Sequence, residues 1–209
     1  MKSNLFFPKS LCFGALASIL IVSCNSNTET TDTSTLNSEA SSTPSSTTDT
    51  PAPTETVAIV NHAEAKVSGT YADTTVDGTV KFDSDATGKI KMTLDLSIPK
   101  KAGKSIAVHL HEHGNCGDTA ILAHGHWNPT NTQHGKWASA NFHLGDIGNV
   151  KLNAQGKGTM TLTTDLWTLG GKPDKNILGK SVIVHGGMDD YKTQPTGDSG
   201  SRIGCGVIQ

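Results

Sequence analysis

Histidines are concentrated in one stretch of this sequence, and histidine is the side chain that most often binds metals in proteins. Seven of the nine histidines lie in residues 108–148, and an eighth, His185, follows in the segment Val-Ile-Val-His-Gly-Gly-Met-Asp-Asp. Independent surface histidines have no reason to gather in this way. The pattern therefore predicts a metal site built on this part of the chain.

Six of these histidines and one aspartate are the candidate ligands. His109 and His111 stand two residues apart in a predicted strand, so their imidazoles share one face. The remaining candidates follow at strand ends or in the stretch between strands: His126, His134, His143, Asp146 and His185. Seven ligands are too many for one tetrahedral ion, and two metals would accommodate them. A nitrogen-rich site suits copper, and a tetrahedral site with a carboxylate suits zinc. We interpret His62, His113 and His124 as ordinary surface or hydrogen-bonded residues.

The elements that would position these ligands are predicted to be strands. Apolar and polar residues alternate with the period of two that is typical of antiparallel sheets, and Gly, Asp and Asn separate the runs. The expected strands are 79–82, 89–96, 106–111, 149–152, 158–162 and 181–185, with hairpin turns at 85–88 and 153–156. Many short strands without a convincing amphipathic helix indicate an all-β sandwich or flattened barrel.

Two stretches break the strand pattern, from about residue 112 to 147 and from about 186 to 202. Both are rich in Gly, Asn, Asp and His. Loops this long in a compact domain are usually functional or disordered. Metal coordination and a disulfide would order them.

The chain opens with the features of an export signal. Lys2 and Lys9 give a positive start that precedes a mostly apolar run at 11–22, which is short for a membrane span but suits a secretory signal. The run ends Leu-Ile-Val-Ser-Cys, which resembles the lipobox of bacterial lipoproteins, where the chain is cut before the cysteine and the cysteine is lipidated. We therefore expect a signal peptide at 1–23 and lipidation of Cys24. The alternative is an ordinary signal peptide with an incidental cysteine.

Residues 24–56 are expected to form a lipidated cysteine followed by a disordered tether. The segment is dominated by Ser and Thr, carries five acidic residues and contains no Lys or Arg. Its few apolar residues cannot offset the entropy lost on ordering. The domain at 57–209 would then be held at a membrane outside the cytoplasm, in the periplasm or at the cell surface.

Charge argues against a nucleic-acid partner. The chain has 17 basic and 19 acidic residues, of which 15 and 14 fall in residues 57–209. A domain so close to neutral is no strongly basic nucleic-acid binder. Any electrostatic attraction for a ligand must therefore come from a few locally placed residues.

Two cysteines remain once the signal peptide and Cys24 are set aside. Cys116 and Cys205 lie far apart in a domain that is predicted to be exported, and oxidising compartments favour disulfides. We expect the two to be joined. The alternative is a pair of free buried thiols.

Five motifs in order give the domain a specific resemblance. They are His-Leu-His-Glu at 109–112, Gly-His-Trp-Asn-Pro at 125–129, His-Leu-Gly-Asp-Ile-Gly-Asn at 143–149, Val-His at 184–185 and Gly-Ser-Arg-Ile-Gly-Cys-Gly-Val-Ile at 200–208. Residues 57–209 closely resemble the copper/zinc superoxide dismutases. The resemblance implies a Greek-key β-sandwich or flattened barrel. It also identifies the two long stretches as the metal loop (112–147) and the electrostatic loop (186–202).

The resemblance implies a role for each candidate residue. The positions that match copper ligands are His109, His111, His126 and His185. Those that match zinc ligands are His126, His134, His143 and Asp146, so that His126 is shared. Asp189 matches a carboxylate that links His109 to His134, and Cys116 and Cys205 match the family disulfide. Arg202 and Thr196 match residues of the channel that leads to copper.

The implied reaction is the disproportionation of superoxide to dioxygen and hydrogen peroxide. Copper would be reduced and reoxidised in turn, and zinc would be structural. His126 would pass a proton, and Arg202 would attract and hydrogen-bond the anion.

Three other functions compete with this interpretation. A metal carrier or copper chaperone on the same fold would be expected to lack a copper ligand or the arginine. A copper-only enzyme would lack the zinc ligands, and a structural zinc module would have no use for Arg202. None of these residues is missing. The short step from His111 to Cys116 shortens a loop that often builds the dimer interface of animal relatives, so a homodimer and a monomer both stay open.

Overall fold

The computed structural model describes residues 57–209, so the predicted signal peptide, Cys24 and the predicted linker lie outside the described residues. The elements in chain order are β1 (His62–Gly69), β2 (Asp77–Ser84), β3 (Ile90–Ser97), η1 (Pro99–Lys101), β4 (Ser105–His111), η2 (Ile121–Ala123), β5 (Gly148–Lys151), β6 (Lys157–Thr164), β7 (Ser181–His185) and β8 (Arg202–Val207). In residues 57–209, no helix has the length and hydrophobicity needed to cross a membrane.

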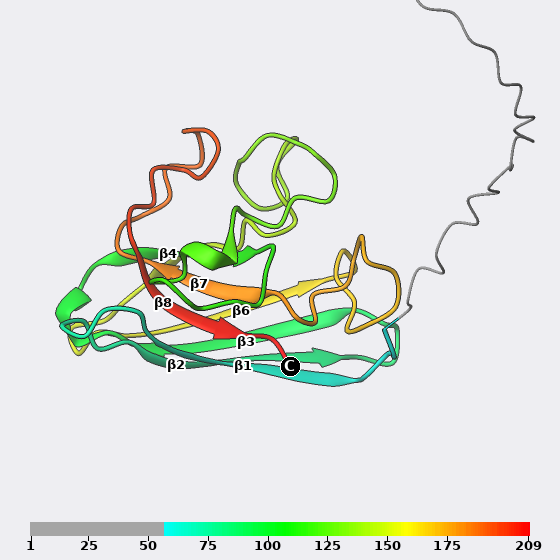
Figure 1. The fold of residues 1–209 in the computed structure, drawn as a ribbon, viewed down its shortest axis with the longest axis horizontal. Coiled ribbons are helices and arrows are strands. Elements are labelled where there is room, and N and C mark those ends of the chain that lie inside the picture. Colours follow the sequence, from blue (N-terminus) through cyan, green and yellow to red (C-terminus); the bar gives the residue numbers. More distant parts are fainter. Residues whose placement is uncertain (1–56) are drawn as a thin grey trace, which may run out of the picture. The chain divides into compact units, whose positions relative to one another are not determined.

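The strands form one antiparallel sheet that closes almost into a barrel. Their order is β5-β4-β7-β8-β1-β2-β3-β6, and the two end strands, β5 and β6, contact each other. β3 pairs with β6 and β4 pairs with β7, although other strands separate each pair in the sequence. These crossovers give the Greek-key connectivity, which confirms the predicted all-β fold class. Figure 1 shows both long loops rising from the side of the barrel that carries β4 and β7.

The six predicted strands correspond to β2 through β7, and both predicted hairpin turns are present, each closed by a backbone hydrogen bond from the glycine at its end. β1 and β8 were not among the predicted strands. β8 reads Arg-Ile-Gly-Cys-Gly-Val, and its glycines obscure the alternation. A Cβ atom at Gly206 would lie 2.5 Å from the backbone oxygen of Lys66 on β1. The close approach of β1 therefore explains the glycine that hides the strand.

The core fills the inside of the barrel. Along β3, buried and exposed residues alternate from end to end, as a half-buried strand requires. Trp167 is fully buried, and its ring lies edge-on to Phe82 with a centroid distance of 6.1 Å. The indole nitrogen of Trp167 donates a 2.9 Å hydrogen bond to the carbonyl of Leu144. The largest buried side chain thus fixes the metal loop to the core.

β4 is buried on both faces, which matters for the histidines. Its inward residues Ile106, Val108 and Leu110 belong to the core, while His109 and His111 on the opposite face are also fully buried. The loops cover that second face. Loops that cover the outer face of a strand can shield its imidazoles from water. Polar side chains on those loops still lie close to the imidazoles.

A disulfide joins Cys116 in the metal loop to Cys205 on β8, which confirms the predicted pairing. Ala120, Ala123 and Ile183 pack around Cys205 in a small second core. The bond closes a loop with a sequence separation of 89 residues. The chain-entropy estimate for a loop of this size is about 4–5 kcal/mol of stabilisation at most.

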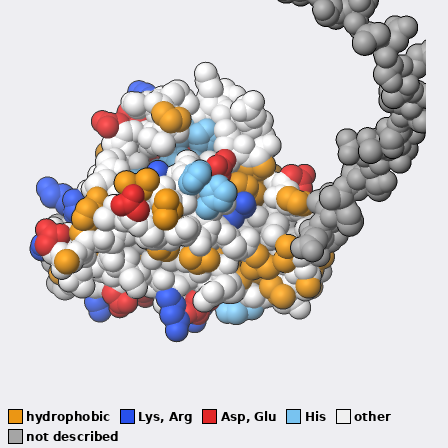
Figure 2. Space-filling model, viewed as in Figure 1, with side chains coloured by type: hydrophobic (Ala, Val, Ile, Leu, Met, Phe, Trp, Pro, Cys, Tyr) orange, Lys and Arg blue, Asp and Glu red, His pale blue; other side chains and the backbone are white. Residues whose placement is uncertain are grey.

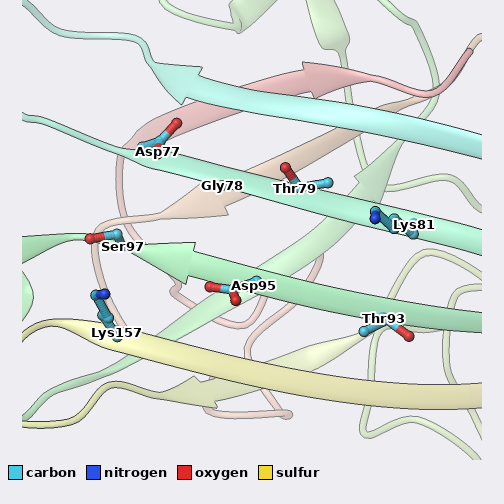
Figure 3. A pocket seen from close by; sticks show the side chains of 8 residues that line it. All are labelled: Asp77, Gly78, Thr79, Lys81, Thr93, Asp95, Ser97 and Lys157. Carbon is cyan, nitrogen blue, oxygen red and sulfur yellow. The ribbon is translucent and has the colours of Figure 1, made fainter.

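Polar surface features differ between the two sides of the barrel. A hollow of about 560 Å³ lies on the outer face of β2, β3 and β6, lined by Thr79, Thr93, Asp95 and other residues (Figure 3). Its side chains are spread along the strands and include no histidine. In Figure 2, by contrast, histidine side chains are visible between and below the loops. The residues that could bind metals therefore gather under the loops.

Candidate metal centre

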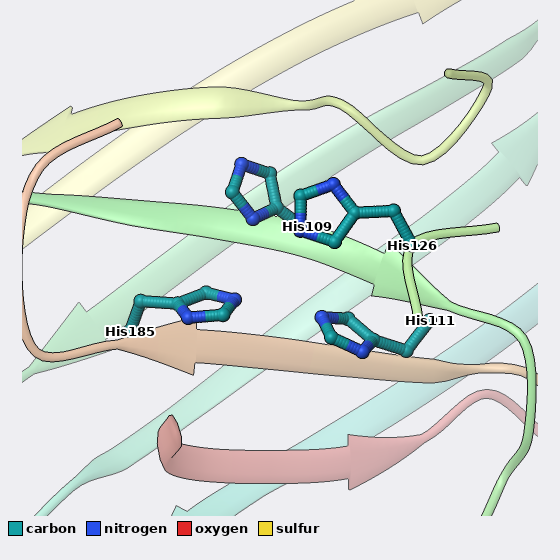
Figure 4. A group of neighbouring side chains, drawn as sticks. All are labelled: His109, His111, His126 and His185. Atoms are coloured by element: carbon teal, nitrogen blue, oxygen red, sulfur yellow. The ribbon is translucent and has the colours of Figure 1, made fainter. Parts of the chain in front are cut away.

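Four histidines from different segments surround one point. His109 and His111 come from β4, His185 comes from the end of β7, and His126 comes from the metal loop (Figure 4). A bridge between His111 and His126 brings that loop segment alongside β4. Ring centroids are 4.0 Å apart for His109 and His126 and 5.6 Å apart for His111 and His185. All four residues are at most 5% exposed.

Hydrogen bonds fix the orientation of each ring in this four-histidine cluster. His109 Nε2 lies 2.9 Å from Asp189 Oδ2, and His111 Nδ1 lies 2.8 Å from the carbonyl oxygen of His124. His185 Nδ1 lies 3.2 Å from the carbonyl oxygen of Gly200. These oxygens can only accept, so each of the three rings donates from the nitrogen named. The opposite nitrogen then carries a lone pair that is free to bind a metal.

A second cluster forms around the carboxylate of Asp146. Its oxygens lie 2.8 Å from His126 Nδ1, 3.0 Å from His134 Nδ1 and 3.3 Å from His143 Nδ1. The backbone N–H groups of Gly135 and His143 donate to Oδ2 of Asp146 and hold it in place. A tetrahedral zinc ion with bonds of about 2.0–2.2 Å separates its ligand atoms by roughly 3.3 Å. The spacing in this carboxylate cluster is close to that value.

Six buried ring nitrogens have no hydrogen-bond partner in the described part of the chain. They are His109 Nδ1, His111 Nε2, His126 Nε2, His134 Nδ1, His143 Nδ1 and His185 Nε2. A buried polar atom without a partner costs about 1–3 kcal/mol. All six belong to the two clusters, and the ring of His126 is common to both. One cation in each cluster would satisfy every one of them, so the residues present fit copper and zinc.

The pKa values of the clustered histidines also suit metal ligands. Burial lowers the pKa of His126 to about 4 and that of His185 to about 3, so both rings are neutral near pH 7. Burial would also lower the pKa of His134, but the close Asp146 carboxylate and the hydrogen bond to Asp189 outweigh burial and raise that pKa to about 9. A proton on His134 thus balances the carboxylates when no cation is bound. A metal ion would take the place of that proton.

Asp189 connects the two clusters. Its Oδ2 accepts from His109, and its Oδ1 lies 2.9 Å from His134 Nε2. Asn149 holds the backbone of Asp189 by two hydrogen bonds of 2.8 Å, one through its amide nitrogen and one through its amide oxygen. At Gly197, φ is +68°, and a Cβ atom there would lie 2.6 Å from His134 Nε2. Only glycine leaves room for the contact between Asp189 and His134.

Arg202 lies at the start of β8, opposite His185 of β7. Its Nη1 donates to the carbonyl oxygen of Ala120 at 2.6 Å and to that of Ile121 at 3.3 Å. Within residues 57–209, the other nitrogens of the guanidinium group donate no hydrogen bond. Thr196 lines a hollow of about 350 Å³ together with His126, His143 and other residues. One side of the guanidinium is thus anchored, and a solvent-accessible hollow reaches the shared histidine.

The structure brings together all the predicted ligand residues and adds positioning residues that sequence reasoning missed. Asn149 stands in a recognised motif, but its partner Asp189 is 40 residues away. Gln194 accepts from the backbone N–H of His134 and donates to its carbonyl, 60 residues apart. Neither residue type nor spacing identifies such partners. The one available signal was the concentration of polar residues and glycine in the electrostatic loop.

Comparisons with known proteins agree with this geometry. The family described as "Copper/zinc superoxide dismutase (SODC)" matches residues 76–208. An extracellular copper/zinc superoxide dismutase of Caenorhabditis elegans is 33% identical over 137 residues, which cover 63% of this chain and 60% of that protein. A copper/zinc superoxide dismutase of Yarrowia lipolytica is 34% identical over 143 residues, which cover 65% of this chain and 91% of that protein.

A solved structure is also similar. The structure titled as the clock protein EA4 superposes with a TM-score of 0.62 at 28% identity and covers 71% of this chain and 93% of its own. The family match spans both clusters, Asp189, Arg202 and the disulfide. The chain therefore belongs to the copper/zinc superoxide dismutase family, and its activity is that of a superoxide dismutase that uses copper and zinc.

Proposed function

We propose that this chain converts two superoxide anions and two protons into dioxygen and hydrogen peroxide at the four-histidine cluster. In this proposal the copper ligands are His109, His111, His126 and His185, and the zinc ligands are His126, His134, His143 and Asp146. The observation that carries the assignment is the set of six buried, unpartnered ring nitrogens, divided between two clusters that share one ring.

Copper held among the four histidines would supply the electron chemistry, because copper has two accessible oxidation states one electron apart. The protein supplies rigid ligands. The hydrogen bonds from His109, His111 and His185 to fixed oxygens hold each ring in one tautomer, with the opposite nitrogen toward the centre. This preorganisation keeps these three rings in place through both half-reactions.

His126 is assigned the role of proton carrier. Its Nδ1 contacts Asp146 at 2.8 Å, while its Nε2 has no hydrogen-bond partner. The Nε2 atom takes up a proton after the first superoxide has reacted and delivers it to the second as peroxide forms. The hollow that His126 shares with Thr196 gives water and the anion access to this ring.

Arg202 is assigned the attraction and docking of superoxide. Burial and the neighbouring histidines lower the pKa of His111 and of His185, and the positive charge of Arg202 adds a smaller decrease, as expected for a guanidinium near the cluster. Anchoring of Nη1 leaves other N–H groups of the same guanidinium to bind an anion. Because the domain is nearly neutral overall, a local cation of this kind has to supply the attraction.

Zinc and Asp189 are assigned a structural role. All four proposed zinc ligands lie on the metal loop, so a cation there would join separate parts of that loop to one another. Asp189 on the electrostatic loop then connects both loops to β4 through His134 and His109. The proposed ion therefore keeps His126 and the hollow beside it in position.

Metal content and superoxide consumption, measured on the same preparation, test this function. We expect one copper and one zinc per chain by plasma mass spectrometry, and a rate of superoxide loss that scales with copper. A protein that binds both metals and does not consume superoxide would instead be a metal carrier. A protein that binds zinc alone would be a structural module.

We also propose that residues 1–23 form a signal peptide, that Cys24 is lipidated and that residues 24–56 tether the domain at 57–209 outside the cytoplasm. The lipobox-like sequence supports this, and a Caenorhabditis elegans relative is named as extracellular. Two acyl signals give stable anchoring where one gives only marginal binding. Cys24→Ser should release the protein from the membrane fraction, and retention at the wild-type level would contradict the anchor.

A homodimer stays a prediction. Ile121 and Leu122, beside the disulfide loop, are 58% and 44% exposed, and adjacent exposed apolar residues often mark an interface. The molecular mass in solution, measured over a range of concentrations, distinguishes a dimer from a monomer.

A further inference from the structure

A third group of metal-binding side chains lies on the surface, outside both buried clusters. Glu112, His113 and His124 are all exposed, and each offers a ligand atom within 4.8 Å of those of the other two. The rings of His113 and His124 are 4.3 Å apart. Figure 2 shows histidine side chains exposed close together on this face, next to an acidic side chain. None of these three side chains has a role in the function proposed above.

The backbone holds this trio together. The N–H of Glu112 donates to the carbonyl of Gly125 at 3.1 Å, and that of His113 donates to the carbonyl of Ala123 at 3.2 Å. The two segments thus run side by side just beyond β4. Ser181 on β7 donates to the carbonyl of His113 at 2.8 Å. These hydrogen bonds fix the backbone positions from which the three side chains start.

The backbone of His124 has an uncommon conformation, with φ of +62° and ψ of −147°. Residues other than glycine seldom adopt a positive φ, and those that do concentrate at functional sites. Here the conformation directs the carbonyl of His124 to His111 Nδ1 at 2.8 Å. The ring of His124 is not needed for that bond and stays beside the ring of His113.

We propose that Glu112, His113 and His124 form a third, surface metal site for a divalent copper or zinc ion. Two imidazoles and one carboxylate are a donor set that both ions accept, and three protein ligands leave an open coordination position. In residues 57–209, no side-chain hydrogen bond occupies any of the three side chains. Copper(II) binds such sites more tightly than zinc(II) in the general order of divalent affinities.

The position of this surface site relates it to the buried ones. Glu112 lines the same hollow of about 350 Å³ as His126 and Thr196. An ion held by the trio therefore stands at the rim of the hollow that reaches the shared histidine. A surface site there would hold metal where it can be exchanged, in contrast to the buried clusters.

One nearby group opposes a cation. Lys180 lies over the ring of Trp127, with Nζ 4.8 Å from the ring centroid, and it interacts electrostatically with Glu112. Burial lowers the pKa of Lys180, and the charge of Glu112 counters that effect. The ammonium group competes with an ion for the carboxylate. Removal of this charge by Lys180→Met should therefore tighten metal binding at the trio.

The test uses protein whose buried clusters are already filled with copper and zinc. Further copper(II) or zinc(II) is added in separate arms, loosely bound metal is removed by dialysis, and metal is counted by plasma mass spectrometry. We expect one additional ion per chain in the wild type and none in His113→Ala or His124→Ala. His62→Ala, which removes an exposed histidine on β1, is the matched control and should keep the additional ion.

Spectroscopy makes the assignment independent of counting. The additional copper(II) should give its own electron paramagnetic resonance signal, which His113→Ala removes while the signal of the buried copper stays. A wild-type protein that retains no additional ion would overturn the proposal, as would an equal loss in His62→Ala. Because the readout is the difference between wild type and variants, it stands even if the buried clusters bind other metals than proposed.

Discussion

The two buried clusters are built differently. In the four-histidine cluster, His109, His111 and His185 stand on β4 and β7, which pair with each other from Val108 to His111. In the carboxylate cluster, His134, His143 and Asp146 all come from the metal loop between β4 and β5. The sheet therefore positions three of the four histidines of the first cluster with or without a metal. The second cluster depends on the conformation of the metal loop.

Contacts outside the carboxylate cluster also hold parts of the metal loop. They include the hydrogen bond between Trp167 and Leu144, the disulfide at Cys116 and the two hydrogen bonds between Gln194 and His134. Without a cation, the negative charge of the buried Asp146 carboxylate is stabilised by the neighbouring histidine rings and by the backbone N–H groups of Gly135 and His143. Loss of the proposed copper should therefore affect chemistry, whereas loss of the proposed zinc should affect structure as well.

His111→Ala is the most direct test of the strand-held cluster. It removes one of four ligands on a rigid element, so copper binding weakens and superoxide consumption falls to the background level. Zinc content and the order of the metal loop should be unchanged, because no atom of the carboxylate cluster is touched. Metal counts and a superoxide assay on the same sample provide the check.

Asp146→Ala should affect the loop-held cluster in the opposite way. Zinc is lost, because one of its four proposed ligands is removed together with the group that orders the backbone at Gly135 and His143. Hydrogen exchange should rise across residues 112–147, while copper is largely retained. If this variant and His111→Ala each lost both metals equally, the division into two differently built clusters would be wrong.

The same contrast explains what the sequence could predict. The strands that bury one face have an alternating pattern, so their positions, the all-β class and the shared face of His109 and His111 were readable. The disulfide followed from the number of cysteines left in an exported domain. The ligand assignments in the loop came from the family resemblance, because no periodicity reports how a loop folds back on itself.

The positioning residues that the sequence did not reveal act through contacts between residues far apart in the chain. Asn149 and Gln194 act on partners 40 and 60 positions away, and Gly197 matters because a side chain would intrude between Asp189 and His134. His113 and His124 look unrelated in sequence, yet their rings are 4.3 Å apart. Such pairs become visible only when the path of the metal loop is known.

Asp189→Asn tests the link between the clusters. The amide has the size of the carboxylate but no charge, and it cannot accept from both His109 and His134 through two oxygens. Residues that orient ligands in this way typically change metal affinity by about 10–100-fold. We expect both metals to bind more weakly, as measured by competition with chelators. Asp190→Asn, at an exposed neighbour that bonds to Thr193, is the matched control.

Arg202→Ile should have the smallest effect, and it separates two roles of one side chain. The structural role is visible in the hydrogen bonds from Nη1 to the carbonyls of Ala120 and Ile121. The proposed electrostatic role acts on superoxide before it reaches the four-histidine cluster. If only the structural role existed, the variant would lose stability and keep its rate and its dependence on ionic strength.

We expect Arg202→Ile to keep both metals and to lower the rate by about tenfold, the low end of what a focused local field supplies. The dependence of the remaining rate on ionic strength should flatten, because salt screens the attraction that the arginine contributed. Arg202→Lys keeps the charge and loses the planar set of N–H donors, so it should recover the salt dependence and only part of the rate. A fully metallated Arg202→Ile protein with unchanged rate and salt dependence would show that other residues guide the anion. The four-histidine cluster would then attract superoxide without the positive charge of Arg202.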